Sequence, residues 1–161
     1  MTWLREQVHE ILESYRRTLQ DDRRHLLDWC HFVDVATKVV GVGSVEIRRY
    51  VVLLEGRDQD DPLFLQVKEA EALVLKAHLP KSVYKNQGQR VVAGQRLMQA
   101  ASDIFLGWLR GPTGRDFYWR QLRDMKASAK IERLSPDQLV LYAGNGGWAL
   151  ARAHARSGDR V

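Results

Sequence analysis

Residues 61–70 carry the pattern that decides the fold, and their sequence is Asp61-Pro62-Leu63-Phe64-Leu65-Gln66-Val67-Lys68-Glu69-Ala70. Side chains of a β-strand alternate between two faces, so Leu63, Leu65 and Val67 share one face. Lys68 shares the other face with Phe64, where burying an ammonium group is unfavourable unless an anion meets it. A lysine that extends its charge from an edge strand into solvent is the alternative interpretation.

Two further strands are expected before this one. Residues from Val33 to Val39 alternate between apolar and polar, which is typical of a strand, and Ile47 to Leu54 form a nearly continuous apolar run. Such a run favours a strand covered on both faces. The turn Gly41-Val42-Gly43-Ser44 joins the two strands, and a second turn at residues 56–62 leads into the third strand.

Helical patterns flank this region. Apolar residues recur at helical spacing from Leu4 to Leu19, and a short second helix is expected to end near Cys30. A mostly helical stretch follows the third strand, with a break at Leu79-Pro80 and a helix from Gln87 to Ala101. Ser135-Pro136-Asp137 begins a final helix, with the serine as its cap.

A hairpin is expected between the last two helices, because residues 104–109 and 117–122 are strand-like and Gly111-Pro112-Thr113-Gly114 joins them. The elements together predict an α+β fold with about five strands in a mainly antiparallel sheet and one inserted helix. We expect an N-terminal helical segment at 1–31, the sheet with its helix at 32–134, and a C-terminal helix at 135–161.

The composition excludes several classes of protein. The chain has 161 residues, of which 45% are hydrophobic, enough for one domain with a core. Its longest apolar run is far too short for a bilayer and its first residues do not resemble a signal peptide, so a cytoplasmic protein without membrane contact is expected. Cys30 is the single cysteine, and with His25 and His31 it lacks the spacing and fourth ligand of a zinc site. No metal site is expected.

The net charge of +5 favours anionic partners without choosing among them. Three arginine pairs could touch phosphate: Arg16-Arg17, Arg23-Arg24 and Arg48-Arg49. Acidic residues interleave with the first two pairs, which favours solvated helix faces there. No nucleic-acid-binding motif is present, so direct nucleic-acid binding is the least favoured partner class.

The glycine turn and Lys68 together predict a phosphate-binding site. Glycines at 41 and 43 let a backbone approach a phosphate with its amide hydrogens, although an ordinary hairpin turn explains them equally well. A strand follows the turn, so it is neither a Walker loop nor a dinucleotide motif. In a protein-kinase small lobe a glycine loop between the first two strands covers the phosphates, and a lysine on the third strand pairs with them. The same order occurs here.

Six segments carry a more specific resemblance, which extends over nearly the whole chain. They are 38–45 (Lys-Val-Val-Gly-Val-Gly-Ser-Val), 61–70, 88–92 (Gly-Gln-Arg-Val-Val), 94–103 (Gly-Gln-Arg-Leu-Met-Gln-Ala-Ala-Ser-Asp), 120–126 (Arg-Gln-Leu-Arg-Asp-Met-Lys) and 150–159 (Leu-Ala-Arg-Ala-His-Ala-Arg-Ser-Gly-Asp). These segments resemble the bacterial family known as domain of unknown function 2252, which is regarded as kinase-like and biochemically uncharacterised. The resemblance implies a small lobe that binds ATP with magnesium. Its implied nucleotide-binding residues are Gly41, Gly43 and Ser44 at the phosphates, Lys68 on the α- and β-phosphates, and the backbone of Gln121 and Leu122 near the adenine.

The resemblance also implies that catalytic groups are missing. Fuller family members carry a Cys-Gly-Asp-x-His…Asn-Phe-Gly segment and an Asp-Phe-Asp-Glu segment, and nothing in this chain matches either. We therefore expect no catalytic residue and a chain that is not catalytically competent alone, whether or not full-length relatives are phosphotransferases. A non-catalytic module that docks on a protein partner or a missing lobe, or a vestigial fragment, is the alternative.

Two departures from the family pattern weaken the expected nucleotide site. Glu46 stands where the family usually has a small loop residue, and its charge would lie near the phosphates. Ala93 stands where the family usually has a glutamate that could pair with the strand lysine. The substitutes for that glutamate would be Gln89, Gln95 or Glu71.

Overall fold

The structure is a computed structural model that describes residues 2–39, 47–123 and 128–158, with side chains from Gln7 onward. The glycine turn predicted to hold phosphates, with Gly41, Gly43 and Ser44, lies outside the described residues, as does Glu46.

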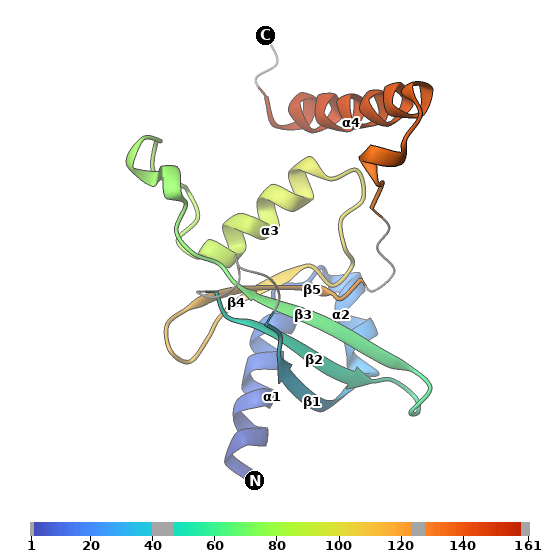
Figure 1. The fold of residues 1–161 in the computed structure, drawn as a ribbon. Coiled ribbons are helices and arrows are strands. Elements are labelled where there is room, and N and C mark those ends of the chain that lie inside the picture. The colour runs from blue at the N-terminus through green and yellow to red at the C-terminus, as the bar shows by residue number, and fades with distance from the viewer. Residues whose placement is uncertain (1, 40–46, 124–127, 159–161) are drawn as a thin grey trace. The chain divides into compact units, whose positions relative to one another are not determined.

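Five strands form one antiparallel sheet, with helices before, within and after it in the sequence (Figure 1). The elements are α1 (Thr2–Arg16), α2 (Asp21–Asp28), β1 (His31–Thr37), β2 (Arg49–Glu55), β3 (Pro62–Glu69), the 3-10 helix η2 (Val74–Ala77), α3 (Gln87–Met98), β4 (Gly107–Arg110), β5 (Asp116–Gln121), the 3-10 helix η3 (Ile131–Arg133) and α4 (Pro136–Ser157). The strands lie in the order β1-β2-β3-β5-β4, and every neighbouring pair is antiparallel. The predicted α+β class and five-stranded antiparallel sheet are therefore confirmed.

One face of the sheet forms the hydrophobic core with α1. Leu65 and Val67 of β3 are 0% and 3% exposed, as the alternation at residues 63–67 predicts. Tyr15 of α1 stacks on Trp119 of β5 with ring centroids 4.6 Å apart, and the Tyr15 hydroxyl donates to the Phe105 carbonyl at 2.6 Å. Such a stacked pair contributes about 0.5–1.5 kcal/mol beyond its burial. The stack therefore fixes α1 against the centre of the sheet.

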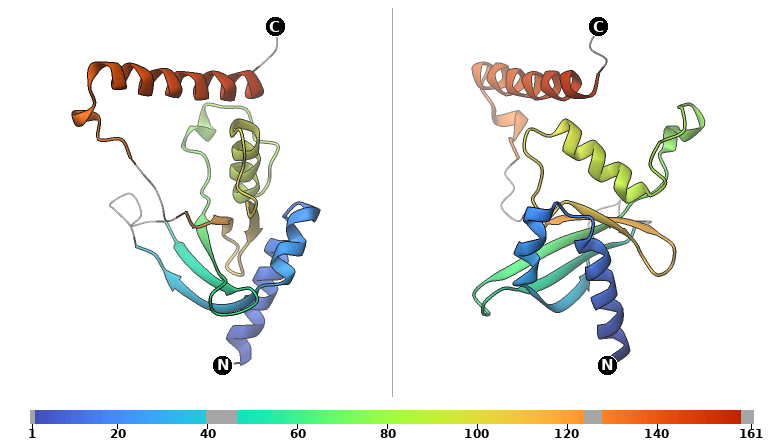
Figure 2. Two further views of the ribbon diagram at one scale, coloured as in Figure 1. Left: turned by 90° about the vertical axis from the view of Figure 1, so that its right-hand side faces the viewer. Right: turned by 180° about the vertical axis from the view of Figure 1, so that it is seen from behind.

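The beginning of α3 is held at the start of β5 by the buried carboxylate of Asp116. Its Oδ1 accepts from the Asn86 side chain at 2.8 Å and from Nε of Arg110 at 2.9 Å. Its Oδ2 accepts from the Gln87 amide at 2.7 Å. A Cβ atom on Gly88 would lie 2.2 Å from the Phe117 carbonyl oxygen, so only glycine allows this close approach of helix and strand. In the views of Figures 1 and 2, α3 and α1 lie on opposite sides of β5.

Two details differ from the sequence-based expectations. Between β3 and α3 the only helical turn is η2, so the predicted mostly helical stretch is wrong before Gln87. β2 is not covered on both faces, because Val52 and Leu54 are buried whereas Val51 and Leu53 remain half-buried. The predicted hairpin is confirmed as β4 and β5, and Gly114 in its turn has a φ of 78°.

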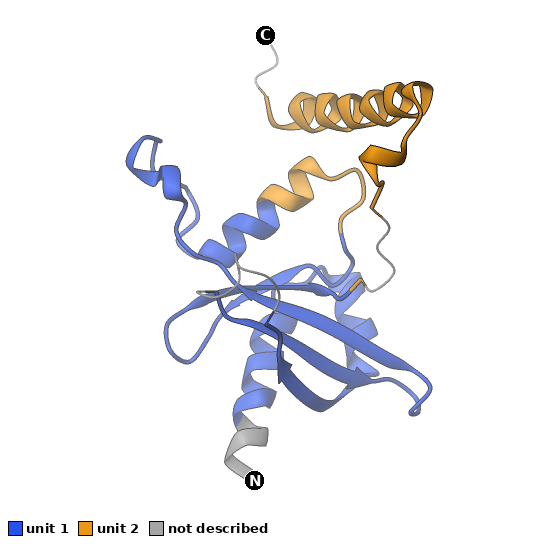
Figure 3. Cartoon of the chain, in the orientation of Figure 1, with its two compact units in different colours: residues 1–93, 103–122 blue, residues 94–102, 123–161 orange. Residues whose placement is uncertain are grey.

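The chain divides into two compact units (Figure 3): Met1–Ala93 with Asp103–Leu122, and Gly94–Ser102 with Arg123–Val161. The first holds the sheet, and the second holds α4. The N-terminus of α4 is capped by Ser135, whose Oγ accepts from the Gln138 amide while the Gln138 side chain accepts from the Ser135 amide. None of the helices in the described parts of the chain is long and apolar enough to cross a membrane.

Candidate functional site

The face of the sheet opposite the core carries a group of polar side chains around Lys68. In the strand register Arg49 of β2 lies opposite Lys68, and Lys68 lies opposite Tyr118 of β5. Gln66 and Arg120 are paired with each other two residues further along the same strands, so their side chains share this face. We call Arg49, Gln66, Lys68, Tyr118 and Arg120 the polar sheet face.

The position of Arg120 is fixed by Gln66. Gln66 is only 7% exposed, and its Oε1 accepts from Nε and Nη2 of Arg120 at 3.2 and 3.1 Å. The amide oxygen is an uncharged partner and leaves the charge of the guanidinium in place. Gln66 thus orients the Arg120 guanidinium without neutralising its charge, as is required of a side chain that binds an anion.

Tyr118 lies between the cationic groups as a neutral phenol. Burial raises the pKa of its hydroxyl, although the charges of Arg120 and Arg49 act to lower it. Both guanidinium groups are therefore close enough to influence the same oxygen. At pH 7 the hydroxyl remains protonated and can donate a hydrogen bond.

Three members of this face are cationic, and the carboxylate of Asp116, which the alternation of β5 places on the same side, is held by hydrogen bonds from Asn86, Gln87 and Arg110. Arg49 and Lys68 are directly opposite each other on antiparallel strands, where Cβ atoms are about 4.5–5.5 Å apart and like charges destabilise the sheet. The nearest acid along β3, Glu69, points to the other face, where it binds Nη1 of Arg115 at 2.6 Å and Nη1 of Arg48 at 3.5 Å. An anion bound at the polar sheet face would relieve this repulsion.

The ends of the predicted glycine turn lie next to this site, although Gly41, Gly43 and Ser44 themselves are outside the described residues. On the β1 side of the turn, the Lys38 amide donates to the Arg49 carbonyl at 2.8 Å. On the β2 side the strand begins at Arg49, directly opposite Lys68. Lys38 and Arg49 are therefore neighbours in the row of Lys68.

Gln121 ends β5 and Leu122 follows it, and the alternation of the strand places the Gln121 side chain with that of Trp119 on the core face. Gln121 is three residues beyond Tyr118, and at about 3.3 Å per residue this places it about 10 Å from the row of Lys68. The Gln121 amide donates to Asp103 at 3.1 Å and the Leu122 amide donates to the Phe64 carbonyl at 2.8 Å. Both donors are therefore engaged within the protein, and an adenine here would need other partners.

The residues considered as replacements for the family glutamate are not gathered in one place. Ala93 is half-buried on α3, whereas Glu71 is exposed just after β3 and its backbone carbonyl accepts from Arg90 at 3.1 Å. Gln89 donates its amide to the Asn86 side chain at 3.0 Å as part of the start of α3. Gln95 lies near the other end of the helix, half-buried.

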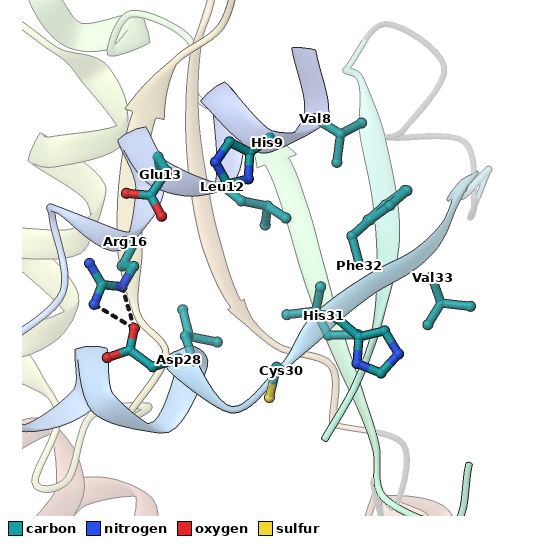
Figure 4. A pocket seen from close by; sticks show the side chains of 12 residues that line it. Val8, His9, Leu12, Glu13, Arg16, Asp28, Cys30, His31, Phe32 and Val33 are labelled. Atoms are coloured by element: carbon teal, nitrogen blue, oxygen red, sulfur yellow. Dashed lines mark hydrogen bonds and ion pairs between the residues drawn. The ribbon is translucent and has the colours of Figure 1, made fainter. Parts of the chain in front are cut away.

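A second polar location is the cavity of about 680 Å³ between α1, α2 and β1 (Figure 4). Arg16 and Asp28 face each other across its rim, with Nε and Oδ1 2.6 Å apart. Burial, aided by the charge of Asp61, raises the pKa of the Cys30 thiol, so this cysteine is a poor nucleophile. Nowhere in the described residues do three potential metal-binding side chains converge, so His25, Cys30 and His31 form no metal site there.

Several residues of the polar sheet face were not singled out by sequence reasoning. Lys68 and Arg49 were candidates, but Gln66, Tyr118 and Arg120 were not. The signal that could have found the latter two was the alternation in residues 116–120, which gives Asp116, Tyr118 and Arg120 a common face.

A model of the family described as "Uncharacterized protein conserved in bacteria (DUF2252)" matches residues 2–161 of the chain. No curated protein and no solved structure matches it.

Proposed function

The chain belongs to the DUF2252 family of uncharacterized bacterial proteins, and we propose that it is a kinase-like small lobe that binds the phosphates of a nucleotide such as ATP. The observation that carries this proposal is the row formed by Arg49, Lys68 and Tyr118, with Arg120 beside it. Because nothing in the chain matches the two acidic segments of fuller family members, which could hold magnesium and orient a nucleophile, the lobe binds nucleotide but does not transfer phosphate alone.

The order of the elements supports a kinase-like lobe. In protein kinases the phosphate-binding lysine lies on the third strand, and the helix that supplies its glutamate follows that strand. Here Lys68 lies on β3 and α3 lies between β3 and β4.

The charge of the site indicates how magnesium acts on binding. The polar sheet face supplies three cationic side chains, and the carboxylate of Asp116 beside them is already held by three hydrogen bonds, so the face offers a magnesium ion no favoured ligand. Magnesium on the triphosphate would also reduce the charge that these side chains attract. ATP without magnesium is therefore expected to bind at least as tightly as the magnesium complex.

A thermal melt with increasing ATP, with and without magnesium, tests the proposal. Ligand at ten times its Kd contributes about 1.4 kcal/mol of stability, which corresponds to a rise of about 3–6 °C in Tm. Lys68→Ala and Arg120→Ala are each expected to weaken binding about tenfold or more, because each removes a charged contact. Lys81→Ala, at an exposed lysine between η2 and α3, is the matched control and should bind as the wild type does.

Two results would contradict this function. The first is an unchanged Tm at millimolar ATP, and the second is an equal shift in wild type and Lys68→Ala. Tripolyphosphate and adenosine separate the two halves of the ligand, and only tripolyphosphate is expected to reproduce most of the shift.

A second candidate function is docking on another protein through α4. Six large apolar side chains on this helix are 43–73% exposed: Leu139, Val140, Leu141, Tyr142, Trp148 and Leu150. We propose as their partner an apolar surface of a protein that carries the acidic segments of fuller family members. Concentration-dependent association, measured by light scattering, should fall in Val140→Glu but not in Val83→Glu, the same change at an exposed valine outside α4. A strict monomer at high concentration would count against docking.

A further inference from the structure

The sheet unit contains a second cavity, on the core face and thus on the side opposite the polar sheet face. Its volume is about 480 Å³, and it lies between α1, β1 and the turn that joins β4 to β5. The floor is formed by buried side chains of the sheet, among them Val52, Val67 and Trp119, which are 3–5% exposed. We call this space the α1 cavity.

The walls of the α1 cavity are almost entirely apolar. Val8 and Ile11 of α1 line one side, and Phe32 and Val35 of β1 line another. Water gains few hydrogen bonds in such a space, so apolar cavities favour apolar ligands over solvent. The volume lies within the range of about 300–1,000 Å³ that is usual for small-molecule sites.

Two arginines give the α1 cavity a positive edge. Arg48 and Arg115 both line it, and both bind the same carboxylate, that of Glu69, at 3.5 and 2.6 Å. Two guanidinium groups therefore share one negative charge, and one positive charge is left in excess. A ligand with an apolar body and an anionic head would place each part in a matching environment.

We propose that the α1 cavity binds a medium-chain fatty acid, with its chain over the apolar floor and its carboxylate at Arg48 and Arg115. The cavity has the volume of about 16 water molecules at ~30 Å³ each, which suits a chain of about ten carbons with its head group. This ligand and site are independent of the nucleotide, because Arg48 and Arg49 are neighbours in sequence and point to opposite faces of the sheet.

Trp119 provides a direct reporter of occupancy. Its ring lines the cavity, and its buried indole Nε1 has no hydrogen-bond partner among the described residues. The indole N–H cross-peak in a nitrogen-15 correlation spectrum should therefore shift when a ligand enters. Trp119→Phe assigns this peak among those of the five tryptophans.

The test is a titration of the full chain with decanoate below its micelle concentration, followed by the Trp119 cross-peak. Decanol and decyltrimethylammonium have the same chain with a neutral and a cationic head. We expect decanoate to bind at least about tenfold more tightly than either. Arg115→Gln should remove that preference, whereas Arg57→Gln in the turn before β3 should keep it.

A blocking variant tests the location. Val35 lies at the rim and is 41% exposed, so Val35→Trp can occlude the cavity without altering buried packing. Val39→Trp makes the same change at a residue that is 82% exposed and does not line the cavity. Decanoate should bind to Val39→Trp and to Lys68→Ala but not to Val35→Trp. Three results would each overturn the proposal. They are unchanged decanoate affinity in Val35→Trp, equal affinity for the three head groups, and a Trp119 cross-peak that does not shift.

Discussion

Substitution of Gly88 by alanine should separate α3 from β5 at the point where the helix begins. The added Cβ would lie 2.2 Å from the Phe117 carbonyl oxygen, about 1.2 Å short of the 3.4 Å at which ordinary contact begins. The backbone oxygen cannot rotate away as a flexible side chain would, so the helix itself must move. A shift of that size breaks the 2.7 Å bond from the Gln87 amide to Asp116 and strains the 2.8 Å bond from Asn86.

The expected loss of stability follows from those contacts. A hydrogen bond to a charged group contributes about 1.5–3 kcal/mol, so losing one and weakening another should lower the free energy of unfolding by about 2–4 kcal/mol. Gly94→Ala provides an internal control, because a Cβ there meets nothing within 4 Å. In that position the substitution should stabilise α3 by about 0.5–1 kcal/mol.

Urea unfolding followed by circular dichroism measures both variants in the same protein. The two substitutions are chemically identical and lie six residues apart on one helix, so helix propensity alone predicts the same sign for both. Equal stabilisation by Gly88→Ala and Gly94→Ala would refute the close approach of α3 to β5.

Three further outcomes are expected elsewhere. Burial opposes ionisation of Glu69, but its bonds to Arg115 and Arg48 outweigh this effect and lower its pKa. The stability that these bonds contribute is therefore complete above the ordinary glutamate pKa of about 4.3 and is lost as the pH falls through the lower folded pKa. Urea unfolding should show that wild type loses more stability than Glu69→Gln between pH 6 and pH 3. Because burial raises the pKa of Cys30, iodoacetamide should alkylate the folded chain at pH 8 more slowly than the unfolded chain, and equal rates would contradict this. Ser135→Ala removes the α4 cap at a cost of about 1 kcal/mol, which should accelerate amide exchange in the first turn of α4 about fivefold.

The sheet was predictable from sequence because its central strand carries an unambiguous alternation. The polar residues Gln66 and Lys68 alternate with Leu65 and Val67, so Leu65 and Val67 are expected to face a core. The structure buries Leu65 and Val67. The stretch after the third strand is predicted to be mostly helical, with a break at Leu79-Pro80, and it contains the apolar residues Leu73, Val74 and Leu75. Those residues are 40–93% exposed, so the chain there has no surface on which a helix could pack.

The candidate site could be predicted only in part, for a different reason. Lys68 and Arg49 can be noticed as single residues, but the pair of Gln66 and Arg120 depends on the register between strands 54 residues apart in sequence. Local patterns contain no information on that register. Arg120 of β5, which is half-buried, is recognised as part of the site only from the alignment of β3 with β5.

The opposition of Arg49 and Lys68 has a consequence for how long the protein survives in a cell. Folding brings the two charges together, so an anion that sits between them favours the folded chain over the unfolded one. If the face binds anions as proposed, an anion at ten times its Kd would lower the population of the unfolded chain, and hence its rate of proteolysis, about tenfold. The abundance of the protein would then follow the supply of its ligand, without any change in its synthesis.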